Sequence, residues 1–312
     1  MKKFLIGCLV FVCLAKAEAT PQKVRVLLDW FVNPNHASLF AAQYSGAFAR
    51  QGLKVELIAP ADSASVPLLL AAGKADIAIS YQPQLYTLVE KGVPVIRVGT
   101  LVGQPLNTLT TLSPSIHRLA DFKGKSIGYA IPGFEDIAIM QMLSQAGIDP
   151  RSVTLVNLNM AATTALLTHR VDGAMTIYRN YEQLSLEDQG THPTVFLPEQ
   201  AGIPAYDELI LLARTSQANT PWLGKFLTAL DQGTQWLEAH PELAWQAFID
   251  RYPEMNTPLN HQAWQATLPL FARNSAVFSA QRYRDMAAFL LKNHVITHIA
   301  PLSTYVQGTE EH

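Results

Sequence analysis

The sequence predicts an α/β protein of two lobes, each a mainly parallel sheet flanked by helices, with a ligand cleft between the lobes. Short apolar segments alternate with amphipathic stretches, which is typical of parallel strands joined by crossover helices. Glycines follow several predicted helices, where a left-handed cap is needed. The chain has 312 residues, of which 49% are hydrophobic, so it can bury cores in two domains of ordinary size.

The first α/β unit is predicted between residues 24 and 101. Strands are expected at residues 24–28, 54–58, 76–80 and 95–101, and helices at residues 36–51, 65–72 and 82–91. Gly52, Gly73 and Gly92 end these helices.

A second unit of the same kind follows, and the pattern then changes to helices. Strands are expected at residues 125–129, 153–157, 173–176, 194–197 and 208–212, and helices at residues 134–146, 161–168, 222–239, 241–251, 261–271 and 280–293. We therefore assign residues 20–107 and 208–312 to the first lobe and residues 108–207 to the second. The chain would then cross between the lobes twice.

The first nineteen residues have the pattern of a secretory signal peptide. Lys2 and Lys3 precede an apolar run over residues 4–15, and an A-x-A cleavage site lies at residues 17–19. The run is too short for a membrane-spanning helix, which needs about 20 apolar residues. We therefore expect residues 1–19 to be removed and the protein to be exported to a periplasm in soluble form.

Composition and motifs favour a binding protein over an enzyme. The net charge of −2 argues against nucleic acid as a partner. Both cysteines, Cys8 and Cys13, lie in the predicted signal peptide, so the mature chain has no thiolate chemistry. Nucleophile-elbow and phosphate-loop signatures are absent from the sequence. We predict no catalytic residue, no metal site and no cofactor.

Aromatic and hydrogen-bonding residues gather where predicted strands end and helices begin. In open α/β sheets the carboxyl ends of the strands are where ligands bind. Aromatic rings would stack on a flat polar ligand, and amides and carboxylates would bond its nitrogens. The turn at Pro132 and Gly133 would also aim a helix N-terminus at the cleft. The candidates are Trp30, Asn35, His36, Ser80, Tyr81, Gln82, Pro132, Gly133, Phe134, Glu135, Tyr178, Asn180, Tyr181, Glu182 and Glu208.

The same segments resemble a known family. The chain is similar to the periplasmic substrate-binding proteins related to the thiamine-pyrimidine-precursor synthases and the aliphatic-sulfonate receptors, from about residue 24 to residue 272. The segments that show the resemblance are Leu28-Asp29-Trp30-Phe31, Asn33-Pro34-Asn35-His36, Gly73-Lys74-Ala75-Asp76-Ile77, Gly103-Gln104-Pro105-Leu106-Asn107, Gly124-Lys125-Ser126-Ile127-Gly128, Pro132-Gly133-Phe134-Glu135, Tyr178-Arg179-Asn180-Tyr181-Glu182 and Tyr206-Asp207-Glu208-Leu209.

The resemblance implies a hinged, two-lobed protein of the periplasmic-binding-protein type II fold. Such a protein would act as a monomer and deliver its ligand to the permease of an ABC importer, closing around the ligand. The first segments resemble the branch that binds aminopyrimidine precursors of thiamine, including the formylated salvage intermediate.

Within that branch, the resemblance suggests a role for individual side chains. Glu182, or else Glu208, would pair with the aminopyrimidine edge. Trp30, Tyr178 and Tyr181 would stack on the ring, and Asn35 or Ser80 would bond its substituent.

Two alternatives remain open. The ligand could be riboflavin or an aliphatic sulfonate, although a sulfonate site would favour arginine or several helix N-termini. The chain could also resemble the synthase branch, which makes the pyrimidine from its own active-site histidine with pyridoxal phosphate and a cysteine-rich iron motif. The cysteine-free mature chain and the export signal argue against that enzyme.

Overall fold

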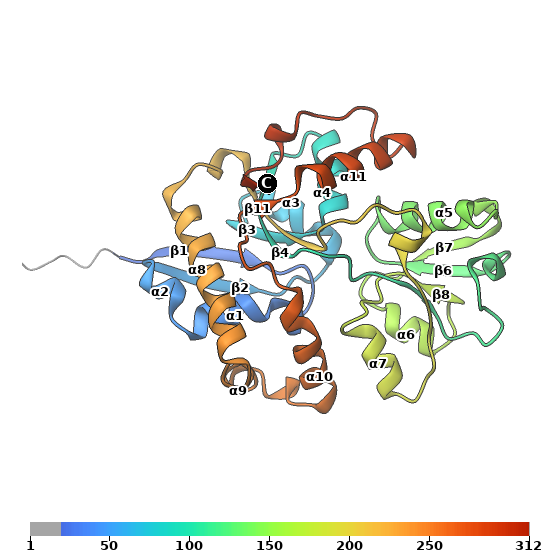
Figure 1. Ribbon diagram of the computed structural model, residues 1–312, viewed down its shortest axis with the longest axis horizontal. Helices are drawn as coiled ribbons and strands as arrows, with labels where there is room; N and C mark the ends of the chain where they lie inside the picture. The colour runs from blue at the N-terminus through green and yellow to red at the C-terminus, as the bar shows by residue number, and fades with distance from the viewer. Residues whose placement is uncertain (1–19, 312) are drawn as a thin grey trace, which may run out of the picture.

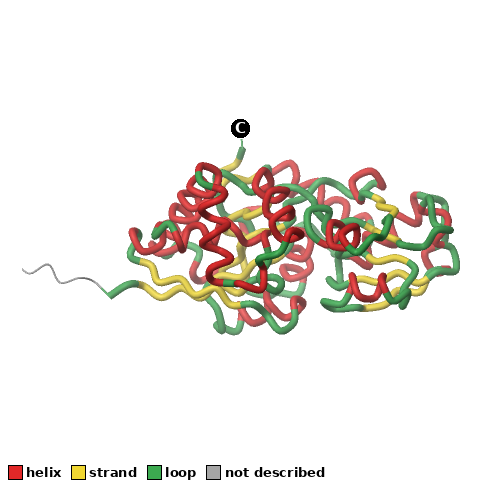
Figure 2. Tube along the Cα trace, turned by 90° about the horizontal axis from the view of Figure 1, so that it is seen from below, coloured by secondary structure: helices red, strands yellow, loops and turns green. Residues whose placement is uncertain are grey.

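The computed structural model describes residues 20–311 as two helix-covered sheets (Figure 1). The predicted signal peptide and both cysteines lie outside the described residues. A view turned by 90° shows the sheets in separate halves of an elongated molecule (Figure 2). Within the described range, no helix combines the length and apolar character needed to cross a membrane.

The sheet of lobe 1 has the order β2-β1-β3-β10-β4. Strands β1 and β2 and strands β1 and β3 pair in parallel, whereas β10 pairs antiparallel with both β3 and β4. The strands are β1 Gln22–Leu27, β2 Leu53–Ile58, β3 Ile77–Ser80, β4 Val95–Val102 and β10 Leu209–Arg214.

The sheet of lobe 2 repeats this plan in the order β7-β6-β8-β5-β9. Strand β6 pairs in parallel with β7 and β8, and β5 pairs antiparallel with β8 and β9. The strands are β5 Leu109–Thr111, β6 Ser126–Tyr129, β7 Thr154–Asn157, β8 Gly173–Ala174 and β9 Thr194–Phe196. In each lobe the antiparallel strand is the first one after the chain arrives from the other lobe.

Helices cover both faces of each sheet (Figure 1). Because side chains alternate along a strand, Val24 and Val26 pack with α1 and α8, while Leu27 packs with α3 and α4 on the opposite face. The helices are α1 Ala37–Tyr44, α2 Ala47–Arg50, α3 Val66–Ala71, α4 Gln82–Glu90, α5 Glu135–Gln145, α6 Ala162–Leu167, α7 Glu182–Asp188, α8 Pro221–Ala239, α9 Pro241–Arg251, α10 Pro258–Thr267 and α11 Ala280–Lys292. A short third sheet joins β11 Val277–Phe278 and β12 Thr309–Glu310.

The structure confirms the α/β alternation and corrects several details. Gly52, Gly73, Gly92 and Gly147 all have positive φ, as their capping role requires. The helix predicted over residues 36–51 is instead the 3-10 helix η1 Pro34–His36, then α1 and α2, separated by a turn at Gly46 with φ of 75°. Strand β5 and helix α7 are not predicted, because both are short and lack a clear apolar period.

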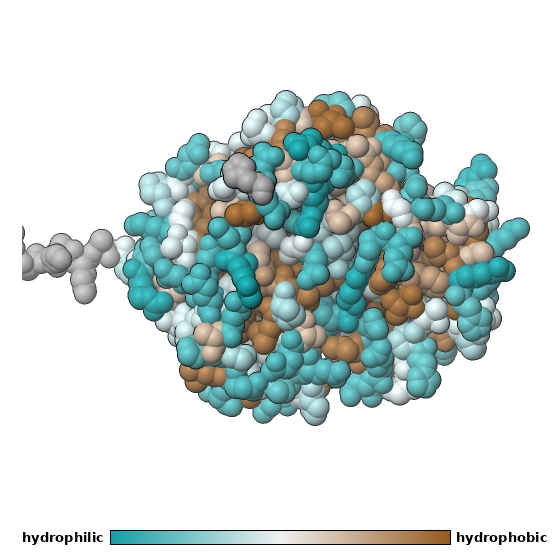
Figure 3. All heavy atoms as spheres, viewed as in Figure 1, coloured by the Kyte–Doolittle hydropathy of each residue, from teal (hydrophilic) through white to brown (hydrophobic). Residues whose placement is uncertain are grey.

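The lobes are linked by the chain between β4 and β5 and by the chain between β9 and β10. Each link leads into a strand that runs antiparallel to its neighbours, β5 in lobe 2 and β10 in lobe 1. Each sheet is therefore mixed rather than purely parallel. The lobe boundaries assigned from the sequence stay a prediction. On the face shown in Figure 3 the surface is mainly hydrophilic, with hydrophobic residues in small scattered groups.

Candidate functional site

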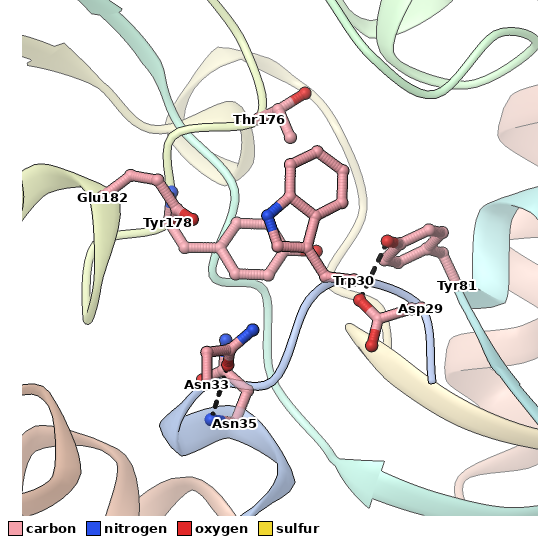
Figure 4. A pocket seen from close by; sticks show the side chains of 8 residues that line it. All are labelled: Asp29, Trp30, Asn33, Asn35, Tyr81, Thr176, Tyr178 and Glu182. Atoms are coloured by element: carbon pink, nitrogen blue, oxygen red, sulfur yellow. Dashed lines mark hydrogen bonds between the residues drawn. The ribbon is translucent and has the colours of Figure 1, made fainter. Parts of the chain in front are cut away.

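A pocket lies between the lobes and is lined by eight residues (Figure 4). The lining residues are Asp29, Trp30, Asn33, Asn35 and Tyr81 from lobe 1 and Thr176, Tyr178 and Glu182 from lobe 2. Asp29, Asn33 and Thr176 are absent from the candidates predicted from the sequence.

The lobe 1 wall is formed by the loop between β1 and η1. Asp29 accepts hydrogen bonds from the Tyr81 hydroxyl and from His36 Nε2, each at 2.9 Å. Asn33 caps η1 by accepting from the Asn35 backbone N–H at 2.8 Å, and Pro34 begins the helix. These contacts hold the loop rigidly, and His36 is fully buried behind the pocket rather than in its lining.

Trp30 provides a large aromatic surface in this wall. The residue is only 8% exposed, yet its indole N–H has no hydrogen-bond partner among residues 20–311. Buried indole N–H groups usually find a partner. The unpaired N–H therefore makes Trp30 a candidate donor to a ligand as well as a stacking surface.

The lobe 2 wall is formed by the chain between β8 and α7. Glu182 begins α7, and its Oε2 accepts from the backbone N–H of Tyr178 at 3.1 Å. Burial raises the pKa of Glu182 to about 8, and the nearby carboxylates of Asp29 and Glu208 add to the rise. The side chain itself is only partly buried, and the raised pKa favours its protonated form, which can donate a hydrogen bond.

Thr176 contributes the strained backbone of this wall. Its φ is 67°, a left-handed value that is rare for a β-branched residue. The conformation is held by the Thr176 hydroxyl, which donates to Glu135 at 2.5 Å, and by its N–H, which donates to Asn107. Strain of this kind gathers at ligand sites.

Glu208 lies behind the pocket, at the start of β10. It accepts from the backbone N–H groups of Leu106 and Asn107 and from the Tyr178 hydroxyl. Burial raises its pKa to about 7. The carboxyl group thereby joins both links between the lobes to the pocket wall.

The turn before α5 is occupied by the protein's own carboxylates. Glu135 accepts from the N–H groups of Ala130 and Ile131, and Asp136 accepts from the N–H of Gly133, which has φ of 81°. The N–H groups expected to face the cleft at this helix are therefore engaged within lobe 2. Pro132, Gly133, Phe134 and Glu135 all lie outside the pocket lining.

The remaining candidates also bond to the protein itself. Ser80 donates to Gln84, and Gln82 bonds Tyr86 and the backbone of Asp207. Tyr181 lies beside the pocket, with its ring 6.5 Å from the ring of Phe31. Asn180 spans the two lobes, with its side chain bonded to residues of lobe 1.

The pocket is acidic. Its lining contains Asp29 and Glu182 and, among the described residues, no lysine, arginine or histidine. Arg179, beside Tyr178 in the chain, forms an ion pair with Glu199 at 2.8 Å outside the lining. Residues 20–311 bring together no group of three side chains that could hold a metal ion.

Comparisons with known proteins place the chain among thiamine-related relatives. Residues 33–244 match the family described as NMT1/THI5 like. A putative thiamine biosynthesis protein of Haemophilus influenzae is 46% identical over 93% of each chain. A formylaminopyrimidine-binding protein of Halalkalibacterium halodurans is 30% identical, over 82% of this chain and 78% of its own.

Other similar proteins are named for different roles. A 4-amino-5-hydroxymethyl-2-methylpyrimidine phosphate synthase of Legionella pneumophila is 30% identical over 80% of each chain. The alkanesulfonate-binding protein SsuA of Xanthomonas axonopodis superimposes with a TM-score of 0.72, covering 94% of this chain and all of its own, at 17% identity. At that identity the likeness shows the two-lobed fold alone.

Proposed function

This chain belongs to the NMT1/THI5-like family, and we propose that it is the exported, monomeric solute-binding component of an ABC importer for a thiamine pyrimidine precursor. The ligand would be an aminopyrimidine such as formylaminopyrimidine, held between the lobes and passed to a permease. One observation supports this ligand most directly. Glu182, whose carboxyl pKa is raised, lies with Trp30, Tyr81 and Tyr178 in the lining of one pocket between the lobes.

The chemistry of an aminopyrimidine matches this set. A protonated carboxyl group can donate to a ring nitrogen while its carbonyl oxygen accepts from the neighbouring amino group. Because Glu182 Oε2 accepts from the Tyr178 N–H, we place the proton on the other oxygen, where it can be directed to the ligand. Trp30 and Tyr178 supply aromatic surfaces from opposite lobes, so a flat ring between them would favour closure.

The alternative ligands fit less well. A sulfonate would bring a permanent negative charge next to Asp29, with no cation in the lining of the described pocket to offset it. Riboflavin has three fused rings and a ribityl chain, so it is much larger than the single ring that Glu182 would pair with in this pocket. The two alternatives therefore have less support than a single-ring ligand.

A synthase role also has less support from the residues. His36 is fully buried, with Nε2 bonded to Asp29 and Nδ1 accepting from the backbone N–H of Asn33. It would have to leave both partners to react. The described pocket offers no lysine to hold pyridoxal phosphate as an imine, and residues 20–311 contain no cysteine.

Calorimetric titration tests the proposal. The protein is unfolded and refolded to remove co-purified ligand, then titrated with an aminomethylpyrimidine, its formyl derivative, thiamine, riboflavin and taurine. We expect tight binding of a pyrimidine alone. Binding of only riboflavin or taurine would contradict the proposed identity of the ligand. A pyridoxal phosphate absorbance in the purified protein would favour the synthase role.

Paired variants connect binding to the pocket. Glu182→Ala is expected to abolish binding of the pyrimidine. Glu187→Ala, on the exposed side of the same helix α7, removes a carboxylate from the same element and should bind like the wild type. Equal binding by both variants would remove Glu182 from the site.

A further inference from the structure

We propose that Asn180 is a positioning residue that sets ligand specificity across the two lobes. Asn180 fixes the orientation of the Asn35 side-chain amide, so that the NH₂ group of Asn35 is presented to the closed pocket as a hydrogen-bond donor. The pocket would then select a pyrimidine whose substituent ends in a carbonyl acceptor over one that ends in an ammonium group. This inference rests on the proposed function and deepens it.

A row of hydrogen bonds begins at helix α10. The Thr267 hydroxyl donates to the backbone carbonyl of Ala263 at 2.6 Å. A carbonyl can only accept, so the single hydroxyl proton of Thr267 is used there. Towards Asn180, 2.8 Å away, the Thr267 oxygen can therefore only accept, and the Asn180 atom facing it must be the NH₂ group.

The same NH₂ group fixes the next amide. Asn180 Nδ2 lies 2.6 Å from the Asn35 side chain, so the atom of Asn35 that faces it must be the acceptor Oδ1. Asn35 is then left with its NH₂ group for the pocket that it lines, and no atom of residues 20–311 accepts from it. The assignment follows from the contact of the Thr267 hydroxyl with Ala263, which at 2.6 Å is shorter than its 2.8 Å contact with Asn180.

The row exists only when the lobes are together. Asn180 belongs to lobe 2, just before α7, whereas Asn35 and Thr267 belong to lobe 1. Helices α7 and α10 meet at this edge of the cleft (Figure 1). All three side chains are at least nine-tenths buried. The orientation of Asn35 is thus a property of the closed form.

The side chain of Asn180 leaves one of its own hydrogen-bonding atoms without a partner among the described residues. Its Oδ1 is buried and has no partner among the described residues. A buried unpaired acceptor is destabilising, so an asparagine here is poorly explained by stability alone. Its NH₂ group, with two donors directed to Thr267 and Asn35, explains why an amide stands at this position.

The expected selectivity follows from donor and acceptor chemistry. A formyl oxygen can accept from the Asn35 NH₂ group. An ammonium group in the same place would set donor against donor and lose its hydrogen bonds to water, and sites discriminate strongly against such unpaired groups.

Titration with two ligands tests the inference. The ligands are an aminomethylpyrimidine and its formyl derivative, which share the ring and differ only in the substituent. We expect the wild type to bind the formyl derivative at least about tenfold more tightly. Asn35→Asp presents a carboxylate oxygen to the pocket and should reverse the preference.

Two threonine variants separate orientation from packing. Thr267→Val removes the acceptor that orients Asn180 and should bring the two affinities closer together. Thr234→Val is the matched control, because Thr234 is also buried, bonds only the carbonyl four residues earlier and lies in α8 outside the row. It should keep the wild-type preference.

The outcomes are distinguishable from failure of the proposed function. Absence of binding of both pyrimidines to the wild type would overturn the proposed function itself. A wild type that prefers the amine, or an unchanged preference in both Thr267→Val and Asn35→Asp, would overturn the role of Asn180 and leave the pyrimidine site in place.

Discussion

The hydroxyl of Tyr178 donates a 3.1 Å hydrogen bond to Glu208 and thereby connects the pocket wall to the links between the lobes. Tyr178 lines the pocket from lobe 2, and Glu208 precedes the first strand after the second crossing. The same carboxyl group accepts from Leu106 and Asn107 in the first crossing. Tyr178 is therefore connected through Glu208 to both links between the lobes.

Replacing Tyr178 with phenylalanine keeps the ring and removes this tie. We expect the affinity for the pyrimidine to fall by about five- to tenfold, because one buried hydrogen bond of about 1 kcal/mol no longer supports the closed arrangement. Calorimetry measures the change. Tyr305→Phe is the control, since this buried ring lies away from the pocket lining. Unchanged affinity in Tyr178→Phe would show that the tie does not contribute to binding.

The pKa of about 8 for Glu182 predicts how binding depends on pH. Below pH 8 the acid is protonated and can donate to the ring, so affinity should be constant near neutrality. Above pH 8 the bound state must take up a proton, and affinity should fall about tenfold for each pH unit. Titrations between about pH 6.5 and 9.5 check this.

Glu182→Gln isolates the role of the proton. An amide can accept from Tyr178 N–H through its oxygen and donate to the ligand through its NH₂ group, as the protonated acid does. We expect this variant to bind at neutral pH with little dependence on pH. If it loses binding as completely as Glu182→Ala, the ionised carboxylate is the form that binds.

The raised pKa values of Glu182 and Glu208 also predict a loss of stability with rising pH. In the unfolded chain both acids ionise near pH 4.5, whereas in the folded chain they keep their protons until about pH 8 and 7. The folded state binds more protons between these values, so these two groups lower stability as the pH rises from about 5 to 8.

Thermal unfolding of a double variant measures that contribution. Glu182→Gln with Glu208→Gln should show a flatter dependence of Tm on pH between about 5 and 8 than the wild type. Glu187→Gln, at an exposed position of α7, should follow the wild type. Parallel curves for the wild type and the double variant would contradict the raised pKa values.

Gly233 is predicted to set the close approach of α8 to α1. A Cβ at this position would lie 2.5 Å from the backbone nitrogen of Ala42, which cannot move without shifting α1. Gly233→Ala should therefore lower the free energy of unfolding by about 1–3 kcal/mol.

Gly224 in the same helix provides the matched control. A methyl group added at Gly224 would meet nothing within 4 Å, so Gly224→Ala should be neutral or stabilise by up to about 1 kcal/mol through helix propensity. Urea unfolding compares the two variants. Equal effects would mean that α1 and α8 adjust freely at this contact.

The sequence by itself determined the order of secondary structure and the helix caps of the protein. Alternating apolar strands and amphipathic helices predict the α/β class, and the glycine caps have the positive φ values that their position requires. The junction around Trp30 and Asn35 could also be recognised, because a strand end, a capping asparagine and Pro34 are neighbours in the chain. These features depend on residues a few positions apart.

Only the tertiary structure decided which polar side chains face the pocket. Glu135, Glu182 and Glu208 look alike in sequence, yet their partners differ. Glu135 is satisfied by four donors from lobe 2 and the first crossing, and Glu208 by the first crossing and Tyr178. Glu182 accepts from Tyr178 and lines the pocket. The strained φ of Thr176 has the same origin. Many of the partners that settle these roles lie tens of residues away along the chain, so hydrogen-bond satisfaction, and with it function, is fixed only when both lobes have folded and met.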